Sequence, residues 1–338
     1  MMQGDMGLHV VVILLTAVGI FIFSHLLSSG TDALGRRFRI QPGVRGATLD
    51  AVGSSFPELC TVVVALYLGA FDAGLGAIAG SALYNILVIP AAAVLAAGPL
   101  RIQKSVVRRD GLLYVAVVLA LILATWFGRE AHGEHVTHQL SAWVGVGGIT
   151  VYIAYVVLLV VQARQHREAR ASSSPDGTTA ATETKPFSAG KTAAALAFGI
   201  AGIGVSTHFL VHSALEIFHE LGFSDAVAGV TLLAAATSLP DTLLSVFAAR
   251  RGDADGAIAN AFGSNSFDIL ICLGLPIVVV GGVLVDWDQS WPILSYLLAS
   301  TIVCVAFLVT DWRLTRREAV VMGVLYVTFL VLAVVGVL

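Results

Sequence analysis

Charged residues are scarce in this chain of 338 residues. They make up 12% of it, against about 25% in a typical soluble domain. Hydrophobic residues make up 57%, so too little polar surface remains to cover a fold in water. Lipid must therefore replace water around much of the chain. This excludes a soluble globular protein, and the lipid bilayer is the expected partner.

Cysteine is also rare, and no secretory leader is evident. Cys60, Cys272 and Cys304 lie inside apolar runs without the spacing of metal ligands, so we interpret all three as packing residues. The N-terminus carries Asp5 but no Lys or Arg, and no cleavage site follows its apolar run. We therefore expect residues 8–28 to be a membrane helix.

Apolar runs long enough to cross a bilayer recur along the chain, since a spanning helix needs about 20 residues. The expected spans are 8–28, 43–69, 73–97, 110–128, 141–163, 192–218, 225–249, 254–282, 290–310 and 318–337. The prediction is an all-α polytopic membrane protein with ten transmembrane helices.

The distribution of basic residues agrees with ten spans. When the loops are assigned alternately to the two sides of the membrane, 18 of the 19 Lys and Arg residues fall on one side. Only Arg129 falls on the other side. Basic loops stay in the cytoplasm. We therefore expect both termini outside and the long central loop inside, in an integral protein of the cell membrane.

The segment 164–191 divides the chain. It is rich in Ser, Thr, Ala and Pro and has no apolar periodicity, which is typical of a disordered cytoplasmic linker. It separates a first unit, 1–163, from a second unit, 192–338.

The two units contain an internal repeat, and all its matches share one constant offset. Residues 46–49 match 229–232, and the match continues through Pro57-Glu58 and Pro240-Asp241 to two Gly-Ser pairs at 80–81 and 263–264. Each unit has five expected helices, an odd number, so the second must enter the membrane from the opposite side. Such inverted repeats are typical of secondary transporters, whose substrate sites lie between the repeats at the bilayer midplane.

Three acids fall near the middle of expected spans, where each charge costs about 2.5–3.5 kcal/mol. They are Glu58, Asp241 and Asp268, and Asp268 is matched by Asn85 in the first repeat. No Lys or Arg lies at comparable depth in the sequence, so a bound cation is the expected partner.

Oxygen ligands accompany these acids. Hydroxyls precede each acid by about one turn, and the prolines free backbone carbonyls by removing an N–H. The hydroxyls belong to Ser54, Ser55, Thr237 and Ser238. An all-oxygen set favours hard cations such as Ca²⁺ and Na⁺.

The Gly-Ser pairs add further polar groups. Ser81 and Asn85 are four residues apart and share a helix face, as do Ser264 and Asp268. The adjacent glycines would let helix backbones approach closely.

These segments, SSFPE…GSALYN and TSLPD…GSNSFD, resemble the paired alpha-repeats of the cation/calcium exchanger superfamily, especially its Na⁺/Ca²⁺ exchanger branch. The resemblance covers both repeats and the plan of five plus five helices, hence most of the chain, with ion-site segments at 46–97 and 229–279. It implies Glu58 and Asp241 as the central ligands of Ca²⁺ and Na⁺. It implies outer Na⁺ sites with Ser81 and Ser264, and carbonyl ligands at Ala51 and Ala234. It also implies that the first and sixth helices slide across the remaining bundle.

Three acidic or basic side chains have no assigned place in this pattern. Asp50 stands where the other repeat has Leu233, and it is either an accessory ion group or a residue near the membrane edge. His25 and His208 match at the same offset as the repeat, either as packing residues or as proton-sensitive elements.

The predicted function is exchange of Ca²⁺ for Na⁺, without enzymatic activity, cofactor or nucleic-acid partner. Exchange of Ca²⁺ for H⁺ on the same fold is the alternative, and a cation channel is a third candidate. Small cations are the expected ligands, and protein partners are left open.

Overall fold

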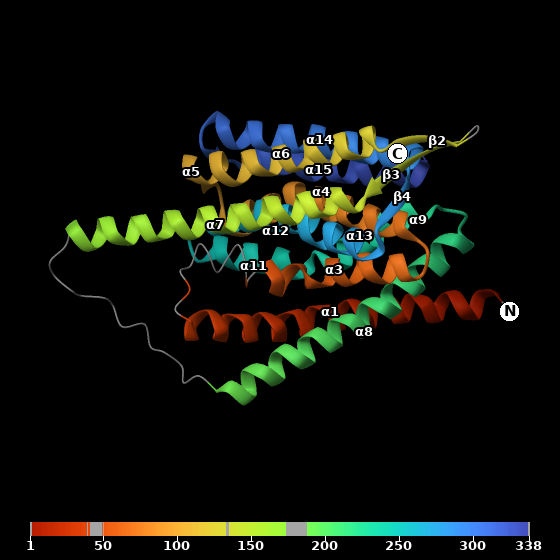
Figure 1. Cartoon of the computed structure of the whole chain (residues 1–338), viewed down its shortest axis with the longest axis horizontal. Coiled ribbons are helices and arrows are strands. Elements are labelled where there is room, and N and C mark those ends of the chain that lie inside the picture. The colour runs from red at the N-terminus through yellow and green to blue at the C-terminus, as the bar shows by residue number, and fades with distance from the viewer. Residues whose placement is uncertain are drawn as a thin grey trace.

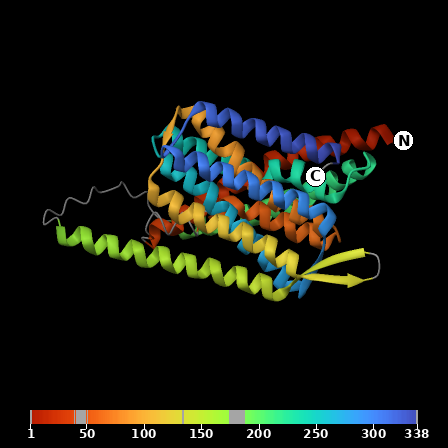
Figure 2. The same cartoon turned by 90° about the horizontal axis from the view of Figure 1, so that it is seen from above.

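The computed structural model describes residues 2–38, 40, 49, 51–132, 135–173 and 188–336. Long helices run side by side along one direction, and both ends of the chain lie at one end of the bundle (Figures 1 and 2). The C-terminal end of α7 (Ala142–Ser173) and the N-terminal end of α8 (Ala189–Glu220) lie at the opposite end. This arrangement agrees with an even number of crossings.

Each expected run coincides with a helix or a chain of short helices. The single helices are α1 (Met2–Arg37), α3 (Ala51–Tyr67), α4 (Phe71–Ala97), α7 (Ala142–Ser173), α8 (Ala189–Glu220), α14 (Trp287–Thr310) and α15 (Arg316–Val335). The composite ones are α5-η2-α6 (Lys104–Val106, Val107–Gly111, Leu112–Phe127), α9-η3-α10-α11 (Asp225–Ala228, Gly229–Leu233, Ala234–Thr237, Leu239–Arg250) and α12-η4-α13 (Ala254–Phe267, Asp268–Leu273, Gly274–Val280).

Within the described part of the chain, eight helices are long and apolar enough to cross a membrane, and a ninth candidate is the bent pair of 225–237 and 239–250. The remaining apolar helix, α3, has 17 residues, fewer than the usual length of a span. The structure describes the expected span at 43–69 only at 49 and from 51 onward, because 41–48 and 50 lie outside the described residues.

The helices α1, α7 and α8 are markedly longer than hydropathy predicts, and α1 extends beyond the expected run of 8–28 at both ends. The helix α7 continues to Ser173 and α8 begins at Ala189, so helical structure covers both ends of the expected linker. Hydropathy reports only the part of a helix that lies in lipid, whereas backbone hydrogen bonds continue into water. Residues 174–187 lie outside the described residues.

Short strands at the ends of the bundle were not part of the predicted all-α fold. At one end of the bundle β1 (Leu100–Arg101) pairs with β5 (Arg313–Leu314). At the other end β3 (His135–Ser141) pairs antiparallel with both β2 (Arg129–His132) and β4 (Gly282–Asp286). The strands join neighbouring helix ends and leave the helical core uninterrupted.

The helix α4 forms the centre of the bundle, and α1 with α8 forms its outermost layer. In α4, 78% of the most apolar stretch is buried, compared with 22% in α1. The helices α1 and α8 lie against each other along one side (Figure 1), where Gly199 packs on Leu27 and Gly202 packs on Phe23. A Cβ at either glycine would collide with its neighbour, so small residues allow this close crossing.

Candidate functional site

Glu58 and Asp241 each directly follow a proline, and the second proline coincides with a break between two helices. Pro57 lies inside α3, directly before Glu58. Pro240 opens α11, directly before Asp241, and α11 is bent by 45° from the helical segment that precedes it. Proline causes such breaks because it cannot donate to the carbonyl four residues earlier. The carboxylate of Asp241 therefore projects from a helix break, whereas that of Glu58 projects from a continuous helix that contains a proline.

Glu58 is fully buried and lies against hydroxyls of both repeats. Ser81 of α4 donates to Oε1 of Glu58 over 3.5 Å, and its Oγ lies 2.8 Å from Oγ of Ser238. Thr237 also neighbours Glu58, but its hydroxyl donates to the carbonyl of Leu233. Oε2 of Glu58 has no hydrogen-bond donor among the described residues.

Asp241 has an equivalent environment. Ser264 of α12 donates to Oδ1 over 3.1 Å, and the amide of Asn85 donates to Oδ2 over 3.5 Å. Ser54 of α3 is a further neighbour. In each half the serine that donates to the acid follows it by 23 residues. The two acids therefore have matching partners, and each also contacts the other half of the chain.

Asp268 completes the group. It is fully buried in η4, next to Ser55, and lies close enough to Glu58 and Asp241 for their charges to interact. Its Oδ2 atom and Oδ1 of its counterpart Asn85 are buried without a donor in the described part of the chain. Apart from the hydroxyl of Ser55, which is also without a partner, the unpartnered oxygens of Glu58, Asp268 and Asn85 are acceptors, which need a positive charge or a proton.

The two backbone carbonyls predicted as ligands occupy matching positions. Ser54 donates to the carbonyl of Ala51 over 3.5 Å, and Thr237 donates to that of Ala234 over 3.4 Å. Both pairs are related by the offset of the internal repeat. The hydroxyls thus lie between the carbonyls and the acids, within one compact oxygen-rich cluster.

All twelve predicted cation-contacting residues described above are at most 4% exposed. They are Ala51, Ser54, Ser55, Glu58, Ser81, Asn85, Ala234, Thr237, Ser238, Asp241, Ser264 and Asp268. Tertiary structure brings α3, α4, α10, α11, α12 and η4 together around them.

Of the three accessory candidates, the two histidines are not part of this cluster. Asp50 lies outside the described residues. His25 in α1 and His208 in α8 are exposed on the outside of the bundle, whereas the neighbouring Ser24 and Thr207 are buried. The histidine side chains therefore point away from the interior that contains the acids.

Several polar side chains of the site were not predicted. Asn265, from the second Gly-Ser-Asn motif, donates to the carbonyl of Ala82 over 3.0 Å, and these two residues are repeat counterparts. The two halves of the chain therefore touch at equivalent positions of the sequence repeat. Asn260 donates to the carbonyl of Asp241 over 3.5 Å. The motif indicated Asn265, but no sequence signal distinguished Asn260 from other polar helix residues.

Our interpretation of the cysteines as packing residues is incomplete for Cys272. Its side chain is buried, but its Sγ lies 3.7 Å from Oδ1 of Asp268 and donates toward the carbonyl of Ser55. An apolar run does not reveal which of its residues faces a polar cluster. Cys304, by contrast, is buried in α14 beside Tyr114.

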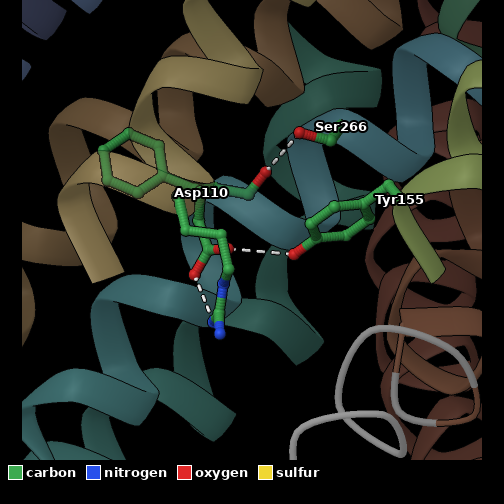
Figure 3. Close-up of polar contacts among 5 residues, drawn as sticks. Asp110, Tyr155 and Ser266 are labelled. Carbon is green, nitrogen blue, oxygen red and sulfur yellow. Dashed lines mark hydrogen bonds and ion pairs between the residues drawn. The ribbon is translucent and has the colours of Figure 1, made fainter. Parts of the chain in front are cut away.

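Another buried acid shows how a structural carboxylate differs from the three clustered ones. Asp110 receives two hydrogen bonds from the guanidinium of Arg109, at 2.7 and 2.9 Å, and a third from the hydroxyl of Tyr155 at 3.0 Å (Figure 3). Its charge is thereby neutralised. Among the described residues, no Lys or Arg forms such a bridge with Glu58, Asp241 or Asp268.

Comparison with known proteins identifies the family. The family model for sodium/calcium exchanger protein matches residues 8–161 and 191–335. The chain is 26% identical to the sodium/calcium exchanger MaX1 of Methanosarcina acetivorans over 347 aligned positions, which cover 95% of this chain and 97% of MaX1.

Solved structures share the fold. The sodium-calcium exchanger NCX_Mj matches with a TM-score of 0.63 at 24% identity, over 96% of this chain and 97% of that one. The H⁺/Ca²⁺ exchanger CAX matches with a TM-score of 0.73 at 14% identity, over 96% and 82%.

Buried carboxylates that lack a basic partner among the described residues, set among hydroxyls and carbonyls in a bundle of apolar helices, are typical of a membrane cation transporter. This chain belongs to the sodium/calcium exchanger family. It is therefore an integral membrane protein of a family of cation antiporters.

Proposed function

We propose that this chain exchanges Ca²⁺ for Na⁺ across the cell membrane by alternating access. Glu58 and Asp241 are the shared ligands of the two cations. The single observation that carries the proposal is their matched environment, in which each acid is fully buried and accepts from a serine 23 residues later. A buried carboxylate without a basic partner requires a cation or a proton.

The ligand assignment follows from hard-ion chemistry. Ca²⁺ takes six to eight oxygens, including carboxylates and carbonyls. Glu58 and Asp241 supply the carboxylates, and Thr237 with Ser54 lies beside them. Na⁺ binds nearer Ser81 and Ser264 and the carbonyls of Ala51 and Ala234, while Asn85 and Asp268 form the middle of the site.

The transport cycle rests on the fold as two inverted five-helix repeats, with ten spans in all. The helices α1 and α8 pack mainly on each other at the edge of the bundle, and both contact α3. In our proposal these two helices slide across the remaining bundle and expose the site to either side. Both termini are outside, and the connection between α7 and α8 is cytoplasmic.

Obligatory exchange follows from the charges of the site. One Ca²⁺ neutralises the two central carboxylates, and so do monovalent cations. An empty site would move uncompensated charges through a low-dielectric interior, which is unfavourable. The empty transporter should therefore not change sides.

Exchange of Ca²⁺ for H⁺ is the second candidate. Three acids lie together, and protons could neutralise them in place of Na⁺. The fold is also shared with the H⁺/Ca²⁺ exchanger CAX.

The decisive experiment measures uptake of labelled Ca²⁺ into proteoliposomes. An outward Na⁺ gradient, a pH gradient and no gradient are compared. Na⁺-driven uptake supports the first proposal, and uptake driven only by the pH gradient supports the second. Uptake that needs neither counter-ion indicates a channel and contradicts both.

Variants test the assigned acids. Glu58→Gln and Asp241→Asn should each abolish driven uptake, because each removes a carboxylate from the proposed Ca²⁺ site. Asp311→Asn is the matched control, since Asp311 is an exposed acid at the end of α14 and should transport like the wild type. Normal uptake by Glu58→Gln would refute the assignment.

A further inference from the structure

The thiol of Cys272 borders the candidate cation site from a position that packing alone does not explain. Cys272 lies in η4, one turn after Asp268, and is fully buried. Its Sγ is 3.7 Å from Oδ1 of Asp268 and 3.5 Å from the backbone carbonyl of Ser55 in α3. The sulfur therefore contacts one group from each half of the chain.

The matching position in the other half shows why the thiol points there. In the second half, the carbonyl of Ser238 accepts the hydroxyl of Thr242, four residues later, over 2.9 Å. In the first half, the residue four after Ser55 is Leu59, which has no hydroxyl. Cys272 reaches the Ser55 carbonyl instead. The two halves thus satisfy equivalent carbonyls by different donors, and only the first uses sulfur.

Two unpartnered oxygens belong to the carboxylates whose charges reach this sulfur. Oδ2 of Asp268 and Oε2 of Glu58 are both fully buried and receive no hydrogen bond within the described residues. Cys272 is close enough to both carboxylates for its thiol to interact electrostatically with them. A cation that binds Asp268 can therefore reach a sulfur, a carboxylate and the Ser55 carbonyl together.

Sulfur changes which cations this arrangement favours. Carboxylates and carbonyls are hard ligands suited to Ca²⁺ and Na⁺, whereas a thiolate is a soft ligand. Cd²⁺ is close to Ca²⁺ in size but forms strong bonds to sulfur. It can thus occupy the same space and gain a bond that Ca²⁺ does not make.

We propose that Cys272, Asp268 and the Ser55 carbonyl bind soft divalent cations such as Cd²⁺, at a position overlapping the Ca²⁺ site. When the Cd–S bond forms, the thiol proton leaves to solvent, and the resulting thiolate and the carboxylate together neutralise the metal charge. Cys272 is then the residue that sets preference among divalent cations. Only the overlap with Ca²⁺ rests on the proposed function.

The test uses the purified full chain in detergent, titrated with Cd²⁺. The ultraviolet charge-transfer band of a cadmium–thiolate bond reports binding without any transport assay. We expect the band in the wild type and its removal by excess Ca²⁺. In Cys272→Ser, the band should be lost and Cd²⁺ affinity should fall by about 10–100-fold.

Two other cysteines supply matched controls. Cys304→Ser removes a buried thiol beside Tyr114, and Cys60→Ser removes a half-buried thiol in α3, two residues after Glu58. Both should keep the band and the Cd²⁺ affinity. Thermal unfolding without divalent cations checks that Cys272→Ser is folded.

The outcomes are separable. A full band in Cys272→Ser, or its loss in Cys60→Ser alone, overturns the proposal. A band that excess Ca²⁺ does not remove also overturns it, because the sites would not overlap. A further outcome is a charge-transfer band that Ca²⁺ removes, in a protein whose proteoliposomes show no driven uptake. That result contradicts the exchanger function but supports the cadmium site.

Discussion

Gly80→Ala should disturb helix packing near the candidate site, whereas Gly263→Ala, at the repeat counterpart, should not. A Cβ at position 80 would lie 2.6 Å from the Cα and carbonyl oxygen of Val230 and 2.8 Å from the Cβ of Ala234. Ordinary contact begins at 3.4 Å, so α4 and η3 must separate. At position 263, no described atom lies within 4 Å of the added carbon.

Two contributions to the stability of Gly80→Ala oppose each other, and only the favourable one applies to Gly263→Ala. Overpacking of this kind costs about 1–3 kcal/mol. Alanine in a helix gains about 1 kcal/mol over glycine. Gly263→Ala should therefore be neutral or slightly stabilising, and Gly80→Ala should be neutral to destabilising by about 2 kcal/mol.

Function should be more sensitive than stability. The displaced segment continues directly into Ala234 and Thr237, beside Glu58. Gly80→Ala should therefore lower Ca²⁺-induced thermal stabilisation and driven Ca²⁺ uptake, while Gly263→Ala leaves both unchanged. Thermal unfolding with and without Ca²⁺, followed by uptake in proteoliposomes, measures the two effects. Equal behaviour of the two variants would refute the argument from the close approach of α4 and η3.

Other substitutions test single contacts. Asn265→Ala should lower the free energy of unfolding by about 1–3 kcal/mol, because it leaves a buried carbonyl without its donor, and denaturant unfolding measures the loss. Tyr155→Phe should destabilise by roughly 1.5–3 kcal/mol in the same assay, since its hydroxyl donates to the carboxylate of Asp110; an unchanged midpoint would contradict this. His25→Ala with His208→Ala should leave the pH profile of Ca²⁺ uptake unaltered, because both rings are exposed outside the bundle, and a shifted profile would restore a proton-sensitive role.

The candidate site was largely predictable because the chain contains it twice. An acid after a proline, with a Gly-Ser pair at a fixed distance beyond it, recurs in both halves at one offset. A single copy of either motif would have been weak. The pairing of Ser81 with Glu58 and of Ser264 with Asp241 repeats the same spacing in three dimensions.

The contacts between the halves were not predictable. Ser81 lies against Ser238, and Asn85 donates to Asp241, although the partners are far apart in the chain in each case. Spacing reports which residues share a face of one helix, but the neighbour of that face depends on how helices pack. The same limit hid the role of Cys272, which lies in an apolar run.

The histidine pair shows a related limit. His25 and His208 match across the repeat as well as any site residue does. Their neighbours Ser24 and Thr207 are buried, however, while the rings face outward. One residue along a helix turns a side chain by about 100°, because there are about 3.6 residues in a turn.

The sequence by itself determined that the chain lies in a membrane, that its halves are related, and that Glu58, Asp241 and Asp268 need cationic partners. These conclusions depend on composition, on spacing and on the cost of a charge in lipid, none of which requires coordinates. Only tertiary structure decided which oxygens surround each acid, that Asp110 is already neutralised, and that a thiol borders Asp268. Those facts arise from packing between helices that are distant in the chain.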